Sequence, residues 1–236
     1  MSISIDEAKR KVVVALDLPR ASKNLAVVRE LRDTVYAYKV HHLYLGAGPD
    51  IISVLRRNGV HRIWVDIKLY DTPDAISQMA FALELVQADI LSVCASGGVR
   101  MMQEAVMSGP SEVYAATVPT SLNEQEVWDS FGSSRSMAVR HMVKLGVEAG
   151  VHGVVCPPDE VERVRRLTGM ERMKIITPGI RTRGEVSHSH FHTVTAREAI
   201  EKGADLLVVG RPITESKDPV SALEVIAKEI AEGVRI

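Results

Sequence analysis

The sequence is poor in cysteine, in aromatic residues and in long apolar runs. It has only two cysteines, Cys94 and Cys156, which are too few for a disulfide framework and fit a reducing compartment. No apolar stretch approaches the roughly 18 residues that a membrane-spanning helix needs. The first ten residues also lack the basic-then-apolar order of a signal peptide. We therefore expect a soluble cytoplasmic protein that does not enter a membrane.

The chain also lacks an excess of either charge. Its 29 basic and 30 acidic residues are interspersed and give a net charge of -1, so the composition offers no electrostatic footprint for nucleic acid or a membrane surface. Nearly half of the 236 residues, 46%, are hydrophobic, which is enough for a large core. No linker, low-complexity tract or sequence repeat interrupts the chain. We expect a single domain over residues 1–236, a length that α/β barrels commonly occupy.

Apolar, β-branched runs alternate with helical patterns along the whole chain. Strands are predicted over 12–17, 35–40, 62–68, 90–94, 113–118, 153–156, 174–177 and 206–210. Helices are predicted over about 22–32, 49–57, 73–86, 99–107, 137–149, 158–167, 195–202 and 219–231, with Ser22 as the N-cap of the first and a polar loop over 121–134. The strands are continuously apolar, which is typical of a parallel sheet covered on both faces. The prediction is an α/β protein with a (β/α)8 TIM barrel; a doubly wound open sheet is the alternative.

Polar residues cluster where the third predicted strand ends, in Asp66-Ile67-Lys68-Leu69-Tyr70-Asp71. Asp66 and Lys68 are two residues apart, so in a regular strand their side chains leave on the same side. Burying such charges is costly unless they compensate one another. In a barrel, strand ends of this kind form the active site. The cluster therefore favours a catalytic site, although a surface ion-pair cluster is the alternative.

Glycines follow the seventh and eighth predicted strands, in Pro178-Gly179 and Gly210-Arg211. The loops after these two strands commonly hold a phosphate group in barrels of this kind, through backbone N–H groups. Arg211 would add a bidentate charge. The alternative for the glycines is ordinary tight-turn geometry.

Seven stretches of the chain carry a common pattern: Ala15-Leu16-Asp17, Tyr38-Lys39-Val40, the block 66–71, Val118-Pro119-Thr120-Ser121, Gly153-Val154-Val155-Cys156, Thr177-Pro178-Gly179-Ile180-Arg181 and Val209-Gly210-Arg211-Pro212-Ile213-Thr214. Taken together, they resemble the orotidine 5'-phosphate decarboxylase family in order and spacing. The Asp66–Asp71 block is shared with related sugar-phosphate decarboxylases and aldolases, including hexulose phosphate synthase. Lys39 favours the orotidylate enzyme, because those relatives generally have an acid there.

The resemblance implies a cofactor-free decarboxylation of orotidine 5'-monophosphate to UMP in pyrimidine biosynthesis. It implies a catalytic network of Lys39, Asp66, Lys68 and Asp71, with Asp71 contributed across the interface of a homodimer. Lys68 would stabilise the ring carbanion and then protonate it. The resemblance also assigns ribose contacts to Asp17 and Lys39, pyrimidine contacts to Thr120 and Ser121, and phosphate contacts to Arg181, Gly210 and Arg211. Further substrate-binding positions are Thr72, Ala75, Pro178, Gly179 and His190.

Several positions depart from the family pattern. Thr72-Pro73-Asp74-Ala75 stands where the family has Ile-Pro-Asn-Thr, and the missing Thr hydroxyl helps to recognise ribose in the family. His41 replaces a Gly, Cys94 replaces a His, and His190 and His192 replace a Gln and an Arg. His188, His190 and His192 could bind a metal, but we expect no metal site in that loop.

These departures keep two other functions open. One is a Mg²⁺-dependent lyase or aldolase of the same suprafamily that acts on a sugar phosphate. The other is a non-catalytic nucleotide-phosphate binder.

Overall fold

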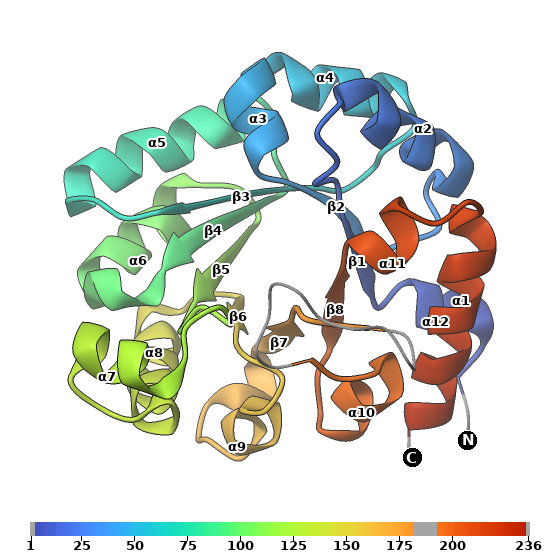
Figure 1. Cartoon of the computed structure of the whole chain (residues 1–236). Coiled ribbons are helices and arrows are strands. Elements are labelled where there is room, and N and C mark those ends of the chain that lie inside the picture. Colours follow the sequence, from blue (N-terminus) through green and yellow to red (C-terminus); the bar gives the residue numbers. More distant parts are fainter. Residues whose placement is uncertain (1–2, 182–192, 235–236) are drawn as a thin grey trace.

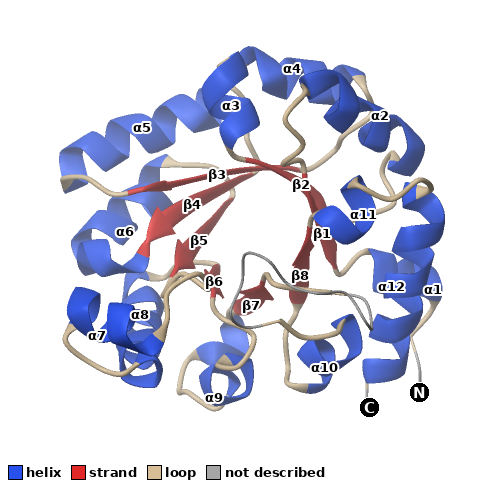
Figure 2. Cartoon of the chain, in the orientation of Figure 1, coloured by secondary structure: helices blue, strands red, loops and turns tan. Residues whose placement is uncertain are grey.

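In the computed structural model, which describes residues 3–181 and 193–234, eight parallel strands close into a barrel. Each strand pairs with the next in the chain, and β8 pairs with β1, as Figure 2 shows. The closed ring confirms the predicted (β/α)8 barrel over the open sheet. The strands are β1 (Val12–Ala15), β2 (Ala37–Val40), β3 (Ile63–Leu69), β4 (Ile90–Cys94), β5 (Glu112–Ala116), β6 (Gly153–Val155), β7 (Lys174–Thr177) and β8 (Leu206–Val209).

Helices surround the barrel on its outside, and α1 lies beside α12 (Figure 1). The α-helices are α1 (Ile5–Lys9), α2 (Ala21–Leu31), α3 (His42–Ala47), α4 (Asp50–Arg57), α5 (Pro73–Leu85), α6 (Gly98–Ser108), α7 (Glu124–Phe131), α8 (Arg135–Ala149), α9 (Val161–Arg165), α10 (Ala196–Glu201), α11 (Arg211–Thr214) and α12 (Pro219–Gly233). Two short 3-10 helices, η1 (Ala95–Gly97) and η2 (Met170–Arg172), complete the described elements. No helix in these two described ranges is long and apolar enough to cross a membrane.

The structure corrects several predicted helix boundaries. Four short helices, α1, α3, α7 and α11, were not predicted, and α7 lies inside the predicted loop 121–134. A capping box of Asn123 and Glu126 begins α7, and this signal was present in the sequence as Asn-x-x-Glu. Ser22 is not an N-cap: α2 begins one residue earlier, after Arg20, without a side-chain cap. Helix boundaries depend on such local hydrogen bonds, which apolar periodicity does not report.

The core has two layers, because successive strand residues point to opposite faces. Val13 and Ala15 of β1 point into the barrel with Trp64, Tyr114 and Ile176. Their neighbours Val12 and Val14 belong instead to the layer between the barrel and the helices. Both faces of each strand are therefore apolar, which explains the continuously apolar runs in the sequence.

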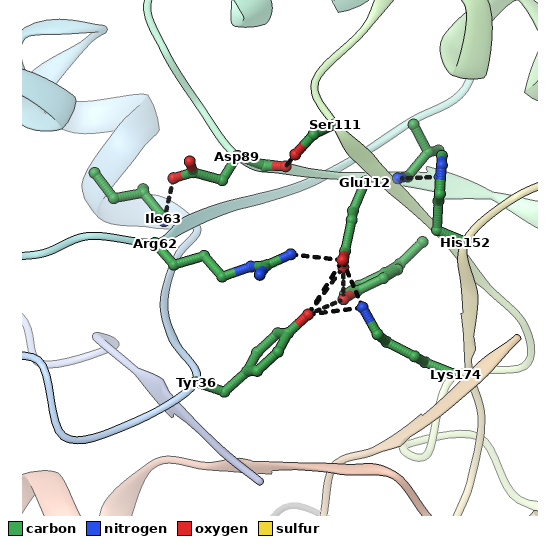
Figure 3. Close-up of polar contacts among 10 residues, drawn as sticks. Tyr36, Arg62, Ile63, Asp89, Ser111, Glu112, His152 and Lys174 are labelled. Atoms are coloured by element: carbon green, nitrogen blue, oxygen red, sulfur yellow. Dashed lines mark hydrogen bonds and ion pairs between the residues drawn. The ribbon is translucent and has the colours of Figure 1, made fainter. Parts of the chain in front are cut away.

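A cluster of charged and phenolic side chains fills the N-terminal end of the barrel (Figure 3). We call Tyr36, Arg62, Glu112, Tyr114 and Lys174 the basal cluster. Glu112 pairs with Arg62 and Lys174 and accepts hydrogen bonds from both tyrosine hydroxyls. Arg62 also lies over the Tyr36 ring, 4.5 Å from its centroid. These contacts compensate a carboxylate that is only 13% exposed.

Candidate active site

A cavity of about 540 Å³ opens at the C-terminal ends of the strands. This is the end of the barrel where (β/α)8 enzymes bind their substrates. Its wall contains charged residues from β2 and β3, hydroxyl groups after β5, and glycines and arginines after β7 and β8. The polar lining residues are Asp17, Lys39, His41, Asp66, Lys68, Thr117, Thr120, Ser121, Arg181, Arg211, Thr214 and Glu215, with Pro178, Gly179 and Gly210 among the others.

Asp66 is the centre of the charged part of this cavity. Its carboxylate is buried, with 7% of the residue exposed, and two lysines approach it from different strands. Lys68 Nζ lies 2.9 Å from Oδ1, and Lys39 Nζ lies 3.2 Å from Oδ2. Lys39 Nζ also lies 3.5 Å from Asp17 Oδ2. Acids and bases thus alternate across the cavity in the order Asp17, Lys39, Asp66, Lys68.

The backbone of β3 is irregular where these charges lie. Lys68 has φ of 51°, in the left-handed region that non-glycine residues rarely adopt. The register between β3 and β4 also shifts between Val65 and Leu69. The regular alternation assumed from the sequence therefore does not hold here, although the Asp66 and Lys68 side chains do meet. Such local strain is characteristic of functional sites.

The lysines determine the charge state of their neighbours. Burial alone would raise the pKa of Asp66, but the positive charges of Lys39 and Lys68 and hydrogen bonds from Ser92 and Lys68 outweigh it and lower the pKa. The pKa of His41 is lowered by burial and by the nearby lysines, against the opposing charges of Asp66 and Asp17. At neutral pH the cavity thus holds an ionised Asp66 beside a neutral His41.

The opposite wall of the cavity is formed by the loops after β7 and β8. Gly179 has φ of 80°, a conformation that L-residues with side chains rarely adopt. Arg181 donates from Nη1 to the Ile180 carbonyl over 2.7 Å. Gly210 directly precedes α11, and Arg211 is the first residue of that helix. Two arginines and two glycines therefore line one side of the same cavity as the Asp66 cluster.

A family model described as "Orotidine 5'-phosphate decarboxylase / HUMPS family" matches residues 10–226. The chain belongs to this family. It is 34% identical over 236 residues to orotidine 5'-phosphate decarboxylase of Moorella thermoacetica, a match that covers 94% of this chain and 93% of that one. It is 33% identical over 227 residues to the enzyme of the same name from Streptococcus pneumoniae, a match that covers 94% of this chain and 97% of that one.

The fold of this family member is also similar to solved structures. A crystal structure of orotidine 5'-phosphate decarboxylase from Lactobacillus acidophilus superposes with a TM-score of 0.79 at 29% identity, over 94% of this chain and 99% of that chain. The resemblance noted in the sequence is therefore confirmed at the level of the family.

The cavity brings together most of the site residues predicted for an orotidylate enzyme of this family. Three of the four predicted catalytic residues, Lys39, Asp66 and Lys68, line it. The predicted binding residues Asp17, Thr120, Ser121, Pro178, Gly179, Arg181, Gly210 and Arg211 line it as well. Their individual roles stay predictions.

Three predicted residues, Asp71, Thr72 and Ala75, do not join the cavity wall of this chain. Asp71 is exposed, and its carboxylate accepts a hydrogen bond from the Thr72 backbone N–H over 2.6 Å. Thr72 and Ala75 lie beside it, at the start of α5, and are likewise outside the lining. His190 lies outside the described residues, as do His188 and His192.

Sequence reasoning missed Ser92, which lies behind Asp66, and Trp64, which donates to Ser92 and also lines the cavity. Ser92 is a single hydroxyl within the apolar run of β4, and Trp64 reads as an ordinary core residue of β3. The only signal in the sequence is Ser92 itself, a polar residue at an inward position of a buried strand.

The two cysteines lie at the cavity. Burial raises the pKa of both the Cys94 thiol and the Cys156 thiol, which disfavours the thiolate form that a nucleophile needs. Within residues 3–181 and 193–234, no group of three or more His, Cys, Asp or Glu side chains is arranged to hold a metal ion.

Proposed function

We propose that this chain decarboxylates orotidine 5'-monophosphate to UMP in pyrimidine biosynthesis, without a cofactor. The observation that carries the proposal is the buried Asp66 carboxylate between the ammonium groups of Lys39 and Lys68, in a cavity whose other wall has two arginines. Membership of the family supports the reaction class.

The chemistry of the reaction matches these charges. When the bond from the ring to the carboxylate breaks, CO2 leaves and its electron pair stays on the ring carbon. A fixed positive charge stabilises that carbanion most when it is already in place before the reaction. Lys68 provides this charge, then donates its proton to the carbon and is protonated again from solvent. Lys39 and Asp66 hold Lys68 in position, and Asp66 faces the departing carboxylate.

The opposite wall of the cavity would bind the phosphate. Arg211 and Arg181 offer guanidinium groups that can donate paired hydrogen bonds to phosphate oxygens. Gly179 and Gly210 leave backbone groups open to a ligand, because they have no side chains. Thr120 and Ser121, which lie between the two walls along the chain, would contact the pyrimidine, and Asp17 and Lys39 the ribose.

We also propose that the enzyme is a cytoplasmic single-domain homodimer in which Asp71 completes the partner's site. Asp71 lies five residues beyond Asp66 but is exposed and outside the cavity of its own chain. Its neighbour Tyr70 is 64% exposed. An exposed aromatic side chain next to a carboxylate that lies outside its own cavity fits a surface that a second copy covers.

The proposed reaction is tested by incubating chelator-treated protein with orotidine 5'-monophosphate and following the absorbance of the pyrimidine. We expect turnover without added metal. Lys68→Ala should lower kcat by about 10²- to 10⁴-fold, the range for loss of a general acid, whereas Lys228→Ala on the outer helix α12 should not change it. Full activity of Lys68→Ala would refute the role of Lys68.

The same assay separates the two alternative functions. Turnover of a sugar phosphate only, and only with Mg²⁺, would favour the lyase or aldolase alternative. If the wild type and Lys68→Ala both bind UMP but neither turns over orotidine 5'-monophosphate, the protein is the non-catalytic binder.

The shared site is tested by mixing two inactive variants, Lys68→Ala and Asp71→Ala. If each site combines Lys68 of one subunit with Asp71 of the other, half of the randomly mixed dimers contain one intact site. About a quarter of the wild-type activity should then return, because a two-fold dimer has two equivalent sites. No recovery after verified subunit exchange would contradict the shared site.

A further inference from the structure

A line of buried hydrogen bonds leads from the barrel interior to Asp66. Ser92 of β4 is fully buried, with 0% exposed, and its Oγ donates to Asp66 Oδ1 over 2.7 Å. Trp64 of β3 donates from Nε1 to the same Ser92 Oγ, also over 2.7 Å. Trp64 is held in turn by an edge contact with Tyr114, with ring centroids 5.1 Å apart and planes at 89°.

The chemistry of the Trp64 and Ser92 side chains determines which group donates each of these hydrogen bonds. An indole N–H can only donate, and a serine hydroxyl has a single hydrogen. Because Trp64 donates to the Ser92 oxygen, the Ser92 hydrogen is left for the Asp66 carboxylate. Trp64 therefore fixes the donor direction of Ser92 as well as its position.

Ser92 and Lys68 share one carboxylate oxygen of Asp66. Oδ1 accepts from both, while Oδ2 faces Lys39. In the proposed reaction Lys68 gives up its proton and becomes a neutral amine, so its attraction to Oδ1 weakens at that moment. Ser92 has no such change, because its hydroxyl stays neutral throughout. Its hydrogen bond can therefore hold the carboxylate in place while the charge of Lys68 changes.

We infer that Ser92 and Trp64 are positioning residues for the reaction, which hold the Asp66 carboxylate in the orientation that aligns Lys68 with the substrate. The inference rests on the proposed decarboxylation. It adds two residues that do not provide chemistry themselves. Ser92 lies behind Asp66, outside the cavity lining. Trp64 belongs to the inner core of the barrel, lines the floor of the cavity and donates to Ser92.

The test measures kcat and KM for orotidine 5'-monophosphate in Ser92→Ala, Ser92→Thr and Trp64→Phe. Ser92→Ala should lower kcat by about ten- to a hundredfold, the size expected for loss of one hydrogen bond to a charged group, with KM within about twofold. Ser92→Thr keeps the hydroxyl and should restore kcat to within about threefold of the wild type. The kcat of Trp64→Phe should lie between the values of Ser92→Ala and Ser92→Thr. Ser111→Ala removes a serine hydroxyl that donates to the Asp89 carbonyl, near the opposite end of the barrel, and should leave both constants unchanged.

A second measurement does not depend on turnover. Titration of the Asp66 carboxyl carbon by ¹³C NMR should show a higher pKa in Ser92→Ala than in the wild type, and a restored pKa in Ser92→Thr, because the hydroxyl favours the charged form. A wild-type protein that is inactive with orotidylate would refute the proposed function, whereas this titration would still test the contact. Three results would each overturn the inference. The first is a wild-type kcat in Ser92→Ala, and the second is an equal loss of kcat in Ser92→Ala and Ser92→Thr. The third is an unchanged Asp66 pKa in Ser92→Ala.

Discussion

The basal cluster allows a quantitative prediction about stability. Replacing Glu112 by Gln keeps the shape of the side chain but removes the negative charge that Arg62 and Lys174 contact. Removing one partner of a fully buried ion pair costs about 3–5 kcal/mol of unfolding free energy. The Arg62 and Lys174 side chains are 33% and 36% exposed, so water compensates part of the loss. We therefore expect Glu112→Gln to lower the unfolding free energy by about 2–3 kcal/mol at pH 7.

The same variant should change how stability depends on pH. Burial alone raises the pKa of Glu112, but hydrogen bonds from Lys174 and Tyr114 and the charges of Arg62 and Lys174 outweigh it and lower the pKa. A lowered folded-state pKa stabilises the fold above the unfolded value, about 4.3, and this contribution is lost as the pH falls through the folded value. The difference between the wild type and Glu112→Gln should thus be constant from pH 7 to about 5 and shrink below about 4.3.

Urea unfolding followed by circular dichroism, at several pH values, measures both effects. Glu148→Gln, an exposed position on α8, is the matched control and should stay within about 0.5 kcal/mol of the wild type. A loss below about 0.5 kcal/mol in Glu112→Gln, or a difference from the wild type that does not shrink in acid, would show that the basal cluster does not stabilise the barrel. Because Glu112 lies at the end opposite the cavity, kcat should not change.

Two further predictions concern substrate binding. Arg211→Ala should raise KM for orotidine 5'-monophosphate by about ten- to a hundredfold, because a charge-assisted hydrogen bond contributes about 1.5–3 kcal/mol; an unchanged KM in steady-state assays would remove Arg211 from the phosphate site. Ala75→Thr restores the hydroxyl that the family pattern has at this position and should lower KM by about three- to tenfold, the value of one neutral hydrogen bond; a KM that stays the same or rises would indicate that this chain recognises its substrate without that contact.

Sequence patterns alone predicted the strand–helix units and favoured the barrel, whereas the closed ring of strands excluded the open sheet. Eight continuously apolar runs, each followed by a helical pattern, favour a parallel sheet covered on both faces, whose strand ends fall together at one edge. Lys39, Asp66 and Lys68 could be placed at one site for that reason, since each directly follows or ends a buried strand. The arginines after β7 and β8 follow from the same rule.

Only the tertiary structure decided how these charges are held. The left-handed backbone at Lys68 and the register shift beside it depend on the pairing of β3 with β4. The hydrogen bond from Trp64 to Ser92 joins residues 28 apart in the chain, and the one from Ser92 to Asp66 joins residues 26 apart. No local pattern reports contacts of that range. The position of Asp71 was also decided by the tertiary structure. Its sequence motif predicts a catalytic carboxylate, but the fold of its own chain leaves that carboxylate exposed and outside the cavity. Spacing fixes which residues leave a strand at one end, but the partner of each buried polar atom is set by the packing of distant segments.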